Sequence, residues 1–235
     1  MKQEFISSLE ENLRYLGFGG DPRLYDELLQ KMEEGNKEFQ ITTESRFDEW
    51  STAQATLHFR RAENDAKYFF VRYDALLSYP DSSEYNRLQT FYITRGTGVS
   101  FKEAFNLLQG RAVHKQMMNM DEEKYYAWIQ LDFIQRTPDN TNYKIRQFRG
   151  EYGYDIVNVL KGYPIKEMEN EDLRMNLILS LKKGNLHPVT FVKERKQEKA
   201  YIAACPQFKT ITICTEATRF YHVFPTIKKK NIHYE

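Results

Sequence analysis

A helix-like segment that ends in glycine is written twice in this chain, and this repeat constrains the fold more than any other feature. S-F-K-E-A-F-N-L-L-Q-G-R-A-V-H-K spans residues 100–115, and G-Y-D-I-V-N-V-L-K-G-Y-P-I-K spans residues 153–166. At a constant offset, Asn106 aligns with Asn158 and Gly110 aligns with Gly162. Both copies carry apolar residues at helical spacing before a glycine that ends the helix. The repeat predicts two copies of one structural unit.

A second repeated segment is a helix that ends in Gly-Asn, and its position relative to the predicted strands differs between the two halves of the chain. An apolar helix face ends at Gly35-Asn36 before the strands of the first half, and a similar one ends at Gly184-Asn185 after the first strands of the second half. Circular permutation of one copy produces this order, and chains tolerate it when their termini lie close together. We therefore expect an α+β fold of two similar lobes, 1–116 and 117–215, each an antiparallel sheet covered by two helices, followed by a basic tail, 216–235.

Local signals place the individual elements. Asp21 with Pro22 predicts the start of a helix, Ser100 with Glu103 is a capping box, and Asn170 predicts a third helix start. A methionine-rich segment, 117–120, is expected to connect the lobes. Alternating apolar and polar residues, bounded by turn residues, predict strands over 37–42, 53–61, 67–74, 88–94, 125–133, 143–148, 189–193, 200–205 and 209–214.

Composition narrows the function classes. Charged residues make up 29% and hydrophobic residues 41%, which is typical of a globular chain. A net charge of +1 argues against a generic nucleic-acid coat or a polybasic membrane binder. No apolar run approaches the roughly 20 residues of a membrane span, and the first residues do not resemble a signal peptide. A cytoplasmic location is therefore expected. The presence of only two cysteines, Cys205 and Cys214, is consistent with it, and these residues are interpreted either as buried thiols or as a redox or metal-binding pair.

Polar residues that follow Gly110, the glycine at the end of the first repeated helix, suggest a small active site. Arg111, His114 and Lys115 stand together, and Tyr125 follows on the next strand, so a cluster in a cleft between the lobes would suit an acid or a phosphate site. A surface histidine explains the same residues. The second copy of the helix repeat has other residues in place of Arg111, His114 and Lys115, although it keeps the apolar residues that pack. We therefore expect any functional site at positions where the two copies differ. The histidines show no metal-ligand spacing, and no metal or cofactor is expected.

Basic and aromatic residues alternate along two predicted hairpins, as in proteins that bind single-stranded nucleic acid. The alternative is that strand alternation turns the aromatic rings toward the helices and the charges toward water. The basic residues concerned are Arg60, Arg61, Lys67, Arg72, Lys144, Arg146 and Arg149.

Several segments resemble a family of domains of unknown function encoded on conjugative transposons and related mobile elements of anaerobic gut bacteria. These segments are E-A-F-N-L-L-Q-G-R-A-V-H-K, A-W-I-Q-L-D-F, E-Y-G-Y-D, L-K-K-G-N and A-C-P-Q-F-K-T-I-T-I, which span most of residues 90 to 215. Cys205 stands where the similar sequences would have asparagine. The resemblance implies a mobile-element context and gives no catalytic residues.

A non-enzymatic binding or accessory module is the function that these observations favour, with another protein as its partner. Single-stranded nucleic acid is the alternative partner. A small enzyme with its site between the lobes is the competing class. The sequence does not indicate an oligomeric state.

Overall fold

The computed structural model describes residues 2–63, 65–80, 82–119, 121–193 and 196–215, and the predicted basic tail, 216–235, lies outside them. Within these residues, 2–108 with 137–142 form one compact unit, and 109–136 with 143–215 form a second. The chain passes between the units at Leu108 to Gln109 and again around the turn at 137–142, whereas the sequence predicts one crossing after residue 116.

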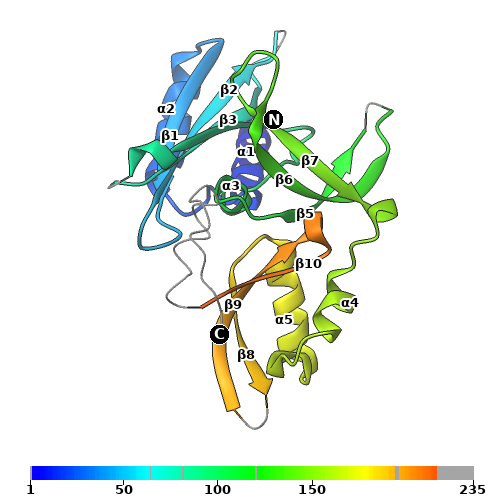
Figure 1. Cartoon of the computed structure of the whole chain (residues 1–235). Coiled ribbons are helices and arrows are strands. Elements are labelled where there is room, and N and C mark those ends of the chain that lie inside the picture. Colours follow the sequence, from blue (N-terminus) through cyan, green and yellow to red (C-terminus); the bar gives the residue numbers. More distant parts are fainter. Residues whose placement is uncertain (1, 64, 81, 120, 194–195, 216–235) are drawn as a thin grey trace. The chain divides into compact units, whose positions relative to one another are not determined.

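The first unit combines an antiparallel sheet with helices (Figure 1). Its strands pair in sequence order as β1 (Glu38–Ser45), β2 (Thr52–Arg61), β3 (Tyr68–Ser78) and β4 (Arg87–Tyr92), with a short 3-10 turn η1 (Ser83–Tyr85) before β4. Its helices are α1 (Lys2–Tyr15), α2 (Pro22–Glu34) and α3 (Phe101–Leu108).

Side-chain capping fixes the ends of these helices as the sequence predicts. The Asp21 carboxylate accepts a hydrogen bond from the Arg23 amide at 3.1 Å, and Pro22 occupies the first helical position of α2. Helix α2 ends where Gly35 adopts a φ of +73°, a backbone conformation that costs glycine little. At α3, the Ser100 amide donates to the Glu103 carboxylate at 2.8 Å, which confirms the capping box.

One face of the β1–β4 sheet is buried against the helices. Along β2, the side chains of Ala53, Ala55, Leu57 and Phe59 are at most 1% exposed, while the residues between them are partly exposed. Phe18, just after α1, contacts other buried aromatic rings from this face and from α3, with centroid distances of 5.1–5.8 Å to Phe70, Tyr73 and Phe101. The helices thus cover one side of the sheet, and among the described residues the side chains on its opposite side are partly or largely exposed.

The second unit contains two further antiparallel sheets. In the first, β6 (Lys124–Arg136) lies between β5 (Val113–Met118) and β7 (Tyr143–Arg149). In the second, β9 (Lys196–Cys205) lies between β8 (His187–Lys193) and β10 (Thr210–Cys214). The segments between the sheets form helices α4 (Ile156–Lys161) and α5 (Glu171–Lys182) and the 3-10 turns η2 (Gly150–Tyr152) and η3 (Lys166–Met168); a further turn, η4 (Pro206–Phe208), joins β9 to β10.

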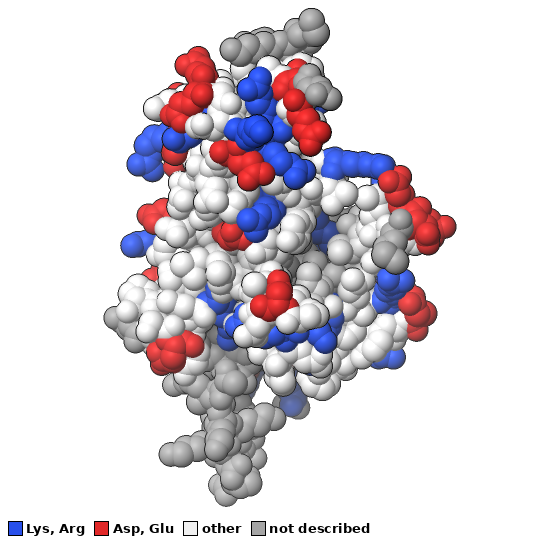
Figure 2. Space-filling model, turned by 90° about the horizontal axis from the view of Figure 1, so that it is seen from above, with Lys and Arg blue, Asp and Glu red and all other residues white. Residues whose placement is uncertain are grey.

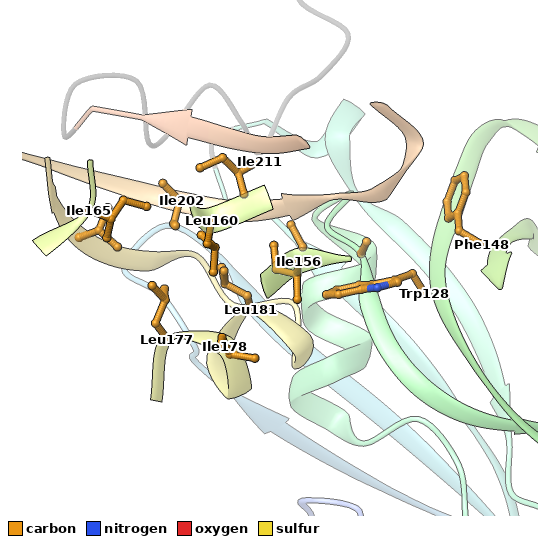
Figure 3. Close-up of a cluster of buried hydrophobic side chains, with 13 residues drawn as sticks. Trp128, Phe148, Ile156, Leu160, Ile165, Leu177, Ile178, Leu181, Ile202 and Ile211 are labelled. Atoms are coloured by element: carbon orange, nitrogen blue, oxygen red, sulfur yellow. The ribbon is translucent and has the colours of Figure 1, made fainter. Parts of the chain in front are cut away.

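A shared core joins the elements of this second unit (Figure 3). The short helix α4 contributes Ile156 and Leu160, and α5 contributes Leu177 and Leu181. Strands of both sheets complete the cluster with Trp128, Phe148, Ile202 and Ile211. All of these side chains are at most 8% exposed, so burial of apolar surface holds the two sheets to the helices.

The α+β class is confirmed, but the duplicated lobes are not. The first unit has one sheet with α1, α2 and α3, one helix more than expected, whereas the described strands of the second unit divide between two sheets. If the second unit were a permuted copy of the first, β10 would correspond to β3 and β7 to β4. Because β3 pairs with β4, β7 would then pair with β10, but β7 pairs with β6. The expectation that 117–120 is only a connector is also wrong, because Met117 and Met118 belong to β5.

Candidate binding face

The side of the β1–β4 sheet opposite the helices, here called the outer face, presents side chains in rows that run across the strands. Antiparallel pairing places Gln40, His58, Arg72 and Tyr92 in one row. The next row holds Thr42, Thr56, Asp74 and Thr90. Residues that pair directly across antiparallel strands lie on the same face, so these rows form a continuous surface.

Asp74 is the centre of a hydrogen-bonded network on the outer face. His58 Nε2 lies 2.6 Å from Asp74 Oδ2, and the Thr90 hydroxyl donates to Asp74 Oδ1 at 2.6 Å. Arg72 lies 3.6 Å from Asp74 Oδ1 and 3.4 Å from His58 Nδ1. In the Nε2–H tautomer, His58 donates to Asp74 and accepts from Arg72. With both ring nitrogens engaged in this way, the histidine is held as a structural group rather than presented as a general base.

Large apolar side chains stand beside this network in contact with solvent. Phe69 is 46% exposed, Leu88 is 49% exposed and Tyr92 is 68% exposed. Phe69 pairs across the strands with Arg60, and Leu88 pairs with Leu76. Exposed aromatic rings next to arginine are the composition that protein interfaces favour.

The charges of the outer face nearly cancel. Arg60 and Arg72 are its cations from β2 and β3, and Glu38, Glu44 and Asp74 are its anions. Figure 2 shows acidic and basic side chains interspersed over the side of the molecule that is in view. A surface built to hold a phosphate backbone carries an excess of cations, which the outer face lacks.

Most of the basic residues of the first predicted nucleic-acid set have intramolecular contacts. Arg61 donates to the carbonyls of Asp65 and Gly35 at 3.2 and 3.4 Å, and the Lys67 ammonium lies 5.0 Å from the ring centroid of Phe69. The aromatic side chains of this hairpin other than Phe69 are buried toward the helices, as strand alternation predicts. These are Phe59, Tyr68, Phe70 and Tyr73.

The second predicted set divides between the two faces of the β5–β7 sheet. Lys144 and Arg146 lie on one face and Arg149 on the other, where its guanidinium stacks 4.1 Å from the ring centroid of Tyr125. Arg146 forms an ion pair with the buried Asp132 at 2.6 Å. Burial alone would raise the pKa of Asp132, but hydrogen bonds from Arg146 and from backbone amides outweigh it and hold the pKa below its ordinary value.

The predicted cluster of Arg111, His114, Lys115 and Tyr125 does not converge. His114 lies on the face of β5–β6 that carries Tyr126, with which its ring stacks at 5.5 Å, whereas Lys115 and Tyr125 lie on the opposite face. Arg111 donates to the Gly184 carbonyl at 2.7 Å, just after α5. Burial, and secondarily Lys182, lowers the pKa of His114. The arrangement offers no shared acid and base.

The cysteines do not form a pair. In the β9–β10 hairpin, Cys205 lies opposite Thr210, and Cys214 lies opposite Tyr201, so the thiols are at different ends. Burial raises the pKa of Cys214 to about 11, which keeps it in the unreactive thiol form.

No group of three or more histidine, cysteine, aspartate or glutamate side chains is placed to hold a metal ion in the described part of the chain. Among the described helices, none combines the length and the apolar character that crossing a membrane requires.

Sequence reasoning missed the rows of the outer face. It included Arg72 among the basic residues of a predicted hairpin, but not His58, Asp74 and Tyr92 as its neighbours, because that requires the register between strands. The register shifts between His58 and Phe59, an irregularity that no local pattern marks.

Comparison with known proteins adds no relative: no family model, curated protein or solved structure matches this chain.

Proposed function

We propose that this chain is a non-catalytic binding protein that contacts a partner protein through the outer face of its β1–β4 sheet. The resemblance to domains encoded on mobile elements supports an accessory role in that setting, in the cytoplasm. The observation that carries the proposal is the combination of exposed apolar side chains with a fixed polar network on one open sheet face.

The energetics of such a face favour association with a protein. Transfer of a large apolar side chain out of water contributes roughly 1.5–3 kcal/mol, and Phe69, Leu88 and Tyr92 are each about half or more exposed before any partner binds. The network around Asp74 restrains His58 and Arg72, so less side-chain entropy is lost when a partner contacts them. The near-neutral charge suits a partner surface that also carries both signs.

A photo-crosslinking experiment tests this proposal with a closely matched control. Tyr92 on the outer face and Tyr15 at the end of α1 are both 68% exposed and belong to the same unit. In cells that carry the natural gene, each of these two tyrosines is replaced in turn by the photoreactive amino acid benzoylphenylalanine. Discrete adducts at position 92, absent at position 15, sensitive to protease and resistant to nuclease, are expected. Equal adducts at both positions, or nuclease-sensitive adducts, would contradict a protein partner.

Single-stranded nucleic acid is the second candidate, and one corner of the outer face favours it. Phe69 is exposed there, Arg60 is its cross-strand neighbour, and the Lys67 ammonium lies over its ring. A ring flanked by cations can stack on a base and contact its phosphates. Under this alternative, a fluorescent single-stranded oligonucleotide binds at low salt and loses affinity steeply as salt rises, and Phe69→Ala weakens it. No binding at low salt excludes it.

A further inference from the structure

A groove with an apolar floor, open to solvent, lies in the second unit. Its residues are distant in the sequence from those of the outer face. It has a volume of about 590 Å³, within the range of roughly 300–1,000 Å³ that ligand sites occupy. Val157 and Leu160 of α4, Ile165, Met168 of η3 and Val192 of β8 line it. Ile165 belongs to the second copy of the sequence repeat, and its neighbours Tyr163 and Lys166 differ from the corresponding residues of the first copy.

The backbone of β8 beside the groove is already hydrogen-bonded. The Val192 amide donates to the Pro164 carbonyl at 2.8 Å, and the Thr190 amide donates to the Glu167 carboxylate at 3.0 Å. Addition of a further strand to this edge would require these bonds to break. A ligand of the groove is therefore held by side chains.

Charged residues at the rim give the groove a preference for anions. Lys161 donates to the Asn158 side chain at 3.1 Å, which positions its ammonium beside the apolar floor. Arg174, from the second turn of α5, lines the groove and is partly buried, yet its guanidinium has no hydrogen-bond or ion-pair partner in the described residues. Glu169 is the one anion among the lining residues.

A partly buried guanidinium without a partner is stabilised when a carboxylate approaches, because the planar fork can donate two parallel hydrogen bonds to it. The apolar floor next to it binds aliphatic or aromatic groups. The groove is open along one side, so a bound ligand keeps part of its surface in water. That suits a peptide, whose polar backbone and alternate side chains remain solvated, better than a lipid tail, which must be fully enclosed to leave water.

We propose that this groove binds a short peptide segment of a partner protein in which apolar side chains stand next to an aspartate or glutamate. The carboxylate contacts Arg174, and the apolar side chains occupy the floor formed by Val157, Met168 and Val192. The thioether of Met168 adapts to side chains of different shape, so the groove accepts a class of sequences rather than a single one.

Selection of phage-displayed random peptides on the full chain tests the proposal. Selected peptides are expected to share an acidic residue beside apolar ones. The synthesised peptides are expected to bind Arg174→Gln at least about tenfold more weakly than the natural chain, because a charge-assisted bidentate contact is lost. Arg174→Lys keeps the charge without the fork and is expected to give a smaller loss. Lys124→Gln, an exposed lysine of the same unit outside the groove, is the matched control and should leave affinity unchanged.

The other outcomes each overturn the proposal. Selected peptides without acidic residues, or peptides that bind Arg174→Gln and the natural chain equally, exclude the carboxylate contact. Failure to select any peptide excludes a peptide site. Sodium laurate, a lipid-like carboxylate, serves as a separate probe, and laurate binding that is tighter than peptide binding and depends on Arg174 would assign the groove to a lipid. Circular dichroism of the glutamine variant controls for loss of folding.

Discussion

His58 Nε2 and Asp74 Oδ2 lie 2.6 Å apart on neighbouring strands of the outer face. Asp74 also accepts from Thr90 on β4, so one carboxylate links β2, β3 and β4. Removal of this carboxylate by Asp74→Ala leaves the partly buried His58 and Thr90 without their acceptor. We expect a loss of about 1–2 kcal/mol in the free energy of unfolding of the first unit. Hydrogen exchange of the amides in β2 and β3 measures this unit separately.

Glu44→Ala is the control for this change. Glu44 is an exposed carboxylate on the same face, on the edge strand β1 and away from the network. Its removal is expected to change stability by less than about 0.5 kcal/mol. Equal losses in the two variants would mean that the network contributes nothing specific.

The ion pair between Arg146 and Asp132 leads to a second prediction, which contrasts with the nucleic-acid interpretation of Arg146. In Arg146→Ala, the buried carboxylate loses its charged partner, and we expect the second unit to lose about 2 kcal/mol of stability. This is less than for a fully buried pair, because the Arg146 side chain is 37% exposed and solvent screens its charge. The chain has two tryptophans, so Trp50→Phe leaves Trp128 as a fluorescence probe of the second unit in urea titrations.

Lys144→Ala tests whether this loss belongs to the ion pair. Lys144 is an exposed neighbour on the same strand whose ammonium contacts Gln135 at 3.3 Å. A change of less than about 0.5 kcal/mol is expected. Because its pKa is depressed, Asp132 stabilises the fold at pH values above its unfolded pKa of about 4, and this contribution is lost as the pH falls through the folded pKa. The acid limb of the stability profile should therefore be shallower in Arg146→Ala.

Burial of His114 predicts a different pH dependence. Its folded pKa is lowered by burial and by Lys182, whereas in the unfolded chain it is about 6.5. Below that pH, the unfolded state takes up a proton before the folded state does, so stability falls as the pH decreases from about 7 to 5. His114→Gln removes this contribution, and its stability should fall less over the same range. His187, whose pKa burial also lowers, accounts for part of the remaining slope.

The urea midpoint of the second unit, measured at several pH values in the Trp50→Phe background, gives this slope. Tyr126 and Trp128 contact the imidazole on its own sheet, and Lys182 faces it from α5. An unchanged slope in His114→Gln would show that the imidazole titrates alike in the folded and unfolded states.

The elements that depend on local interactions were predictable from the sequence. The caps at Asp21, Ser100 and Asn170 involve residues at most three positions apart, and the structure contains the corresponding hydrogen bonds. The predicted strands also occur, because alternation follows from one buried face. Strand β5 was missed because its pairing of His114 with Trp128 joins distant residues, and Val113 to Met118 carries little alternation of its own.

The candidate sites were less predictable for the same reason. Alternation separates Arg72 from Tyr73, but only the register reveals that Arg72 and Tyr92 are neighbours. The sequence places His114 and Lys115 together, although adjacent strand residues point to opposite faces. The duplication was inferred from helix ends, which recur because glycine ends many helices, and strand pairing in the second unit does not follow it.

The N-cap of α5 offers a prediction with an internal control. The Asn170 side chain accepts from the Leu173 amide at 3.0 Å and so satisfies one of the free amides at the start of the helix. Asn170→Ala should destabilise the second unit by about 1 kcal/mol. Asn176→Ala makes the same chemical change at an exposed position within the same helix, where alanine has the higher helix propensity, and should be neutral or slightly stabilising. Urea titrations monitored by Trp128 compare the two variants, and equal losses would show that the cap does not stabilise α5. Because α5 supplies Leu177 and Leu181 to the core and Arg174 to the groove, loss of the cap should also weaken the binding of selected peptides, whereas Asn176→Ala should not.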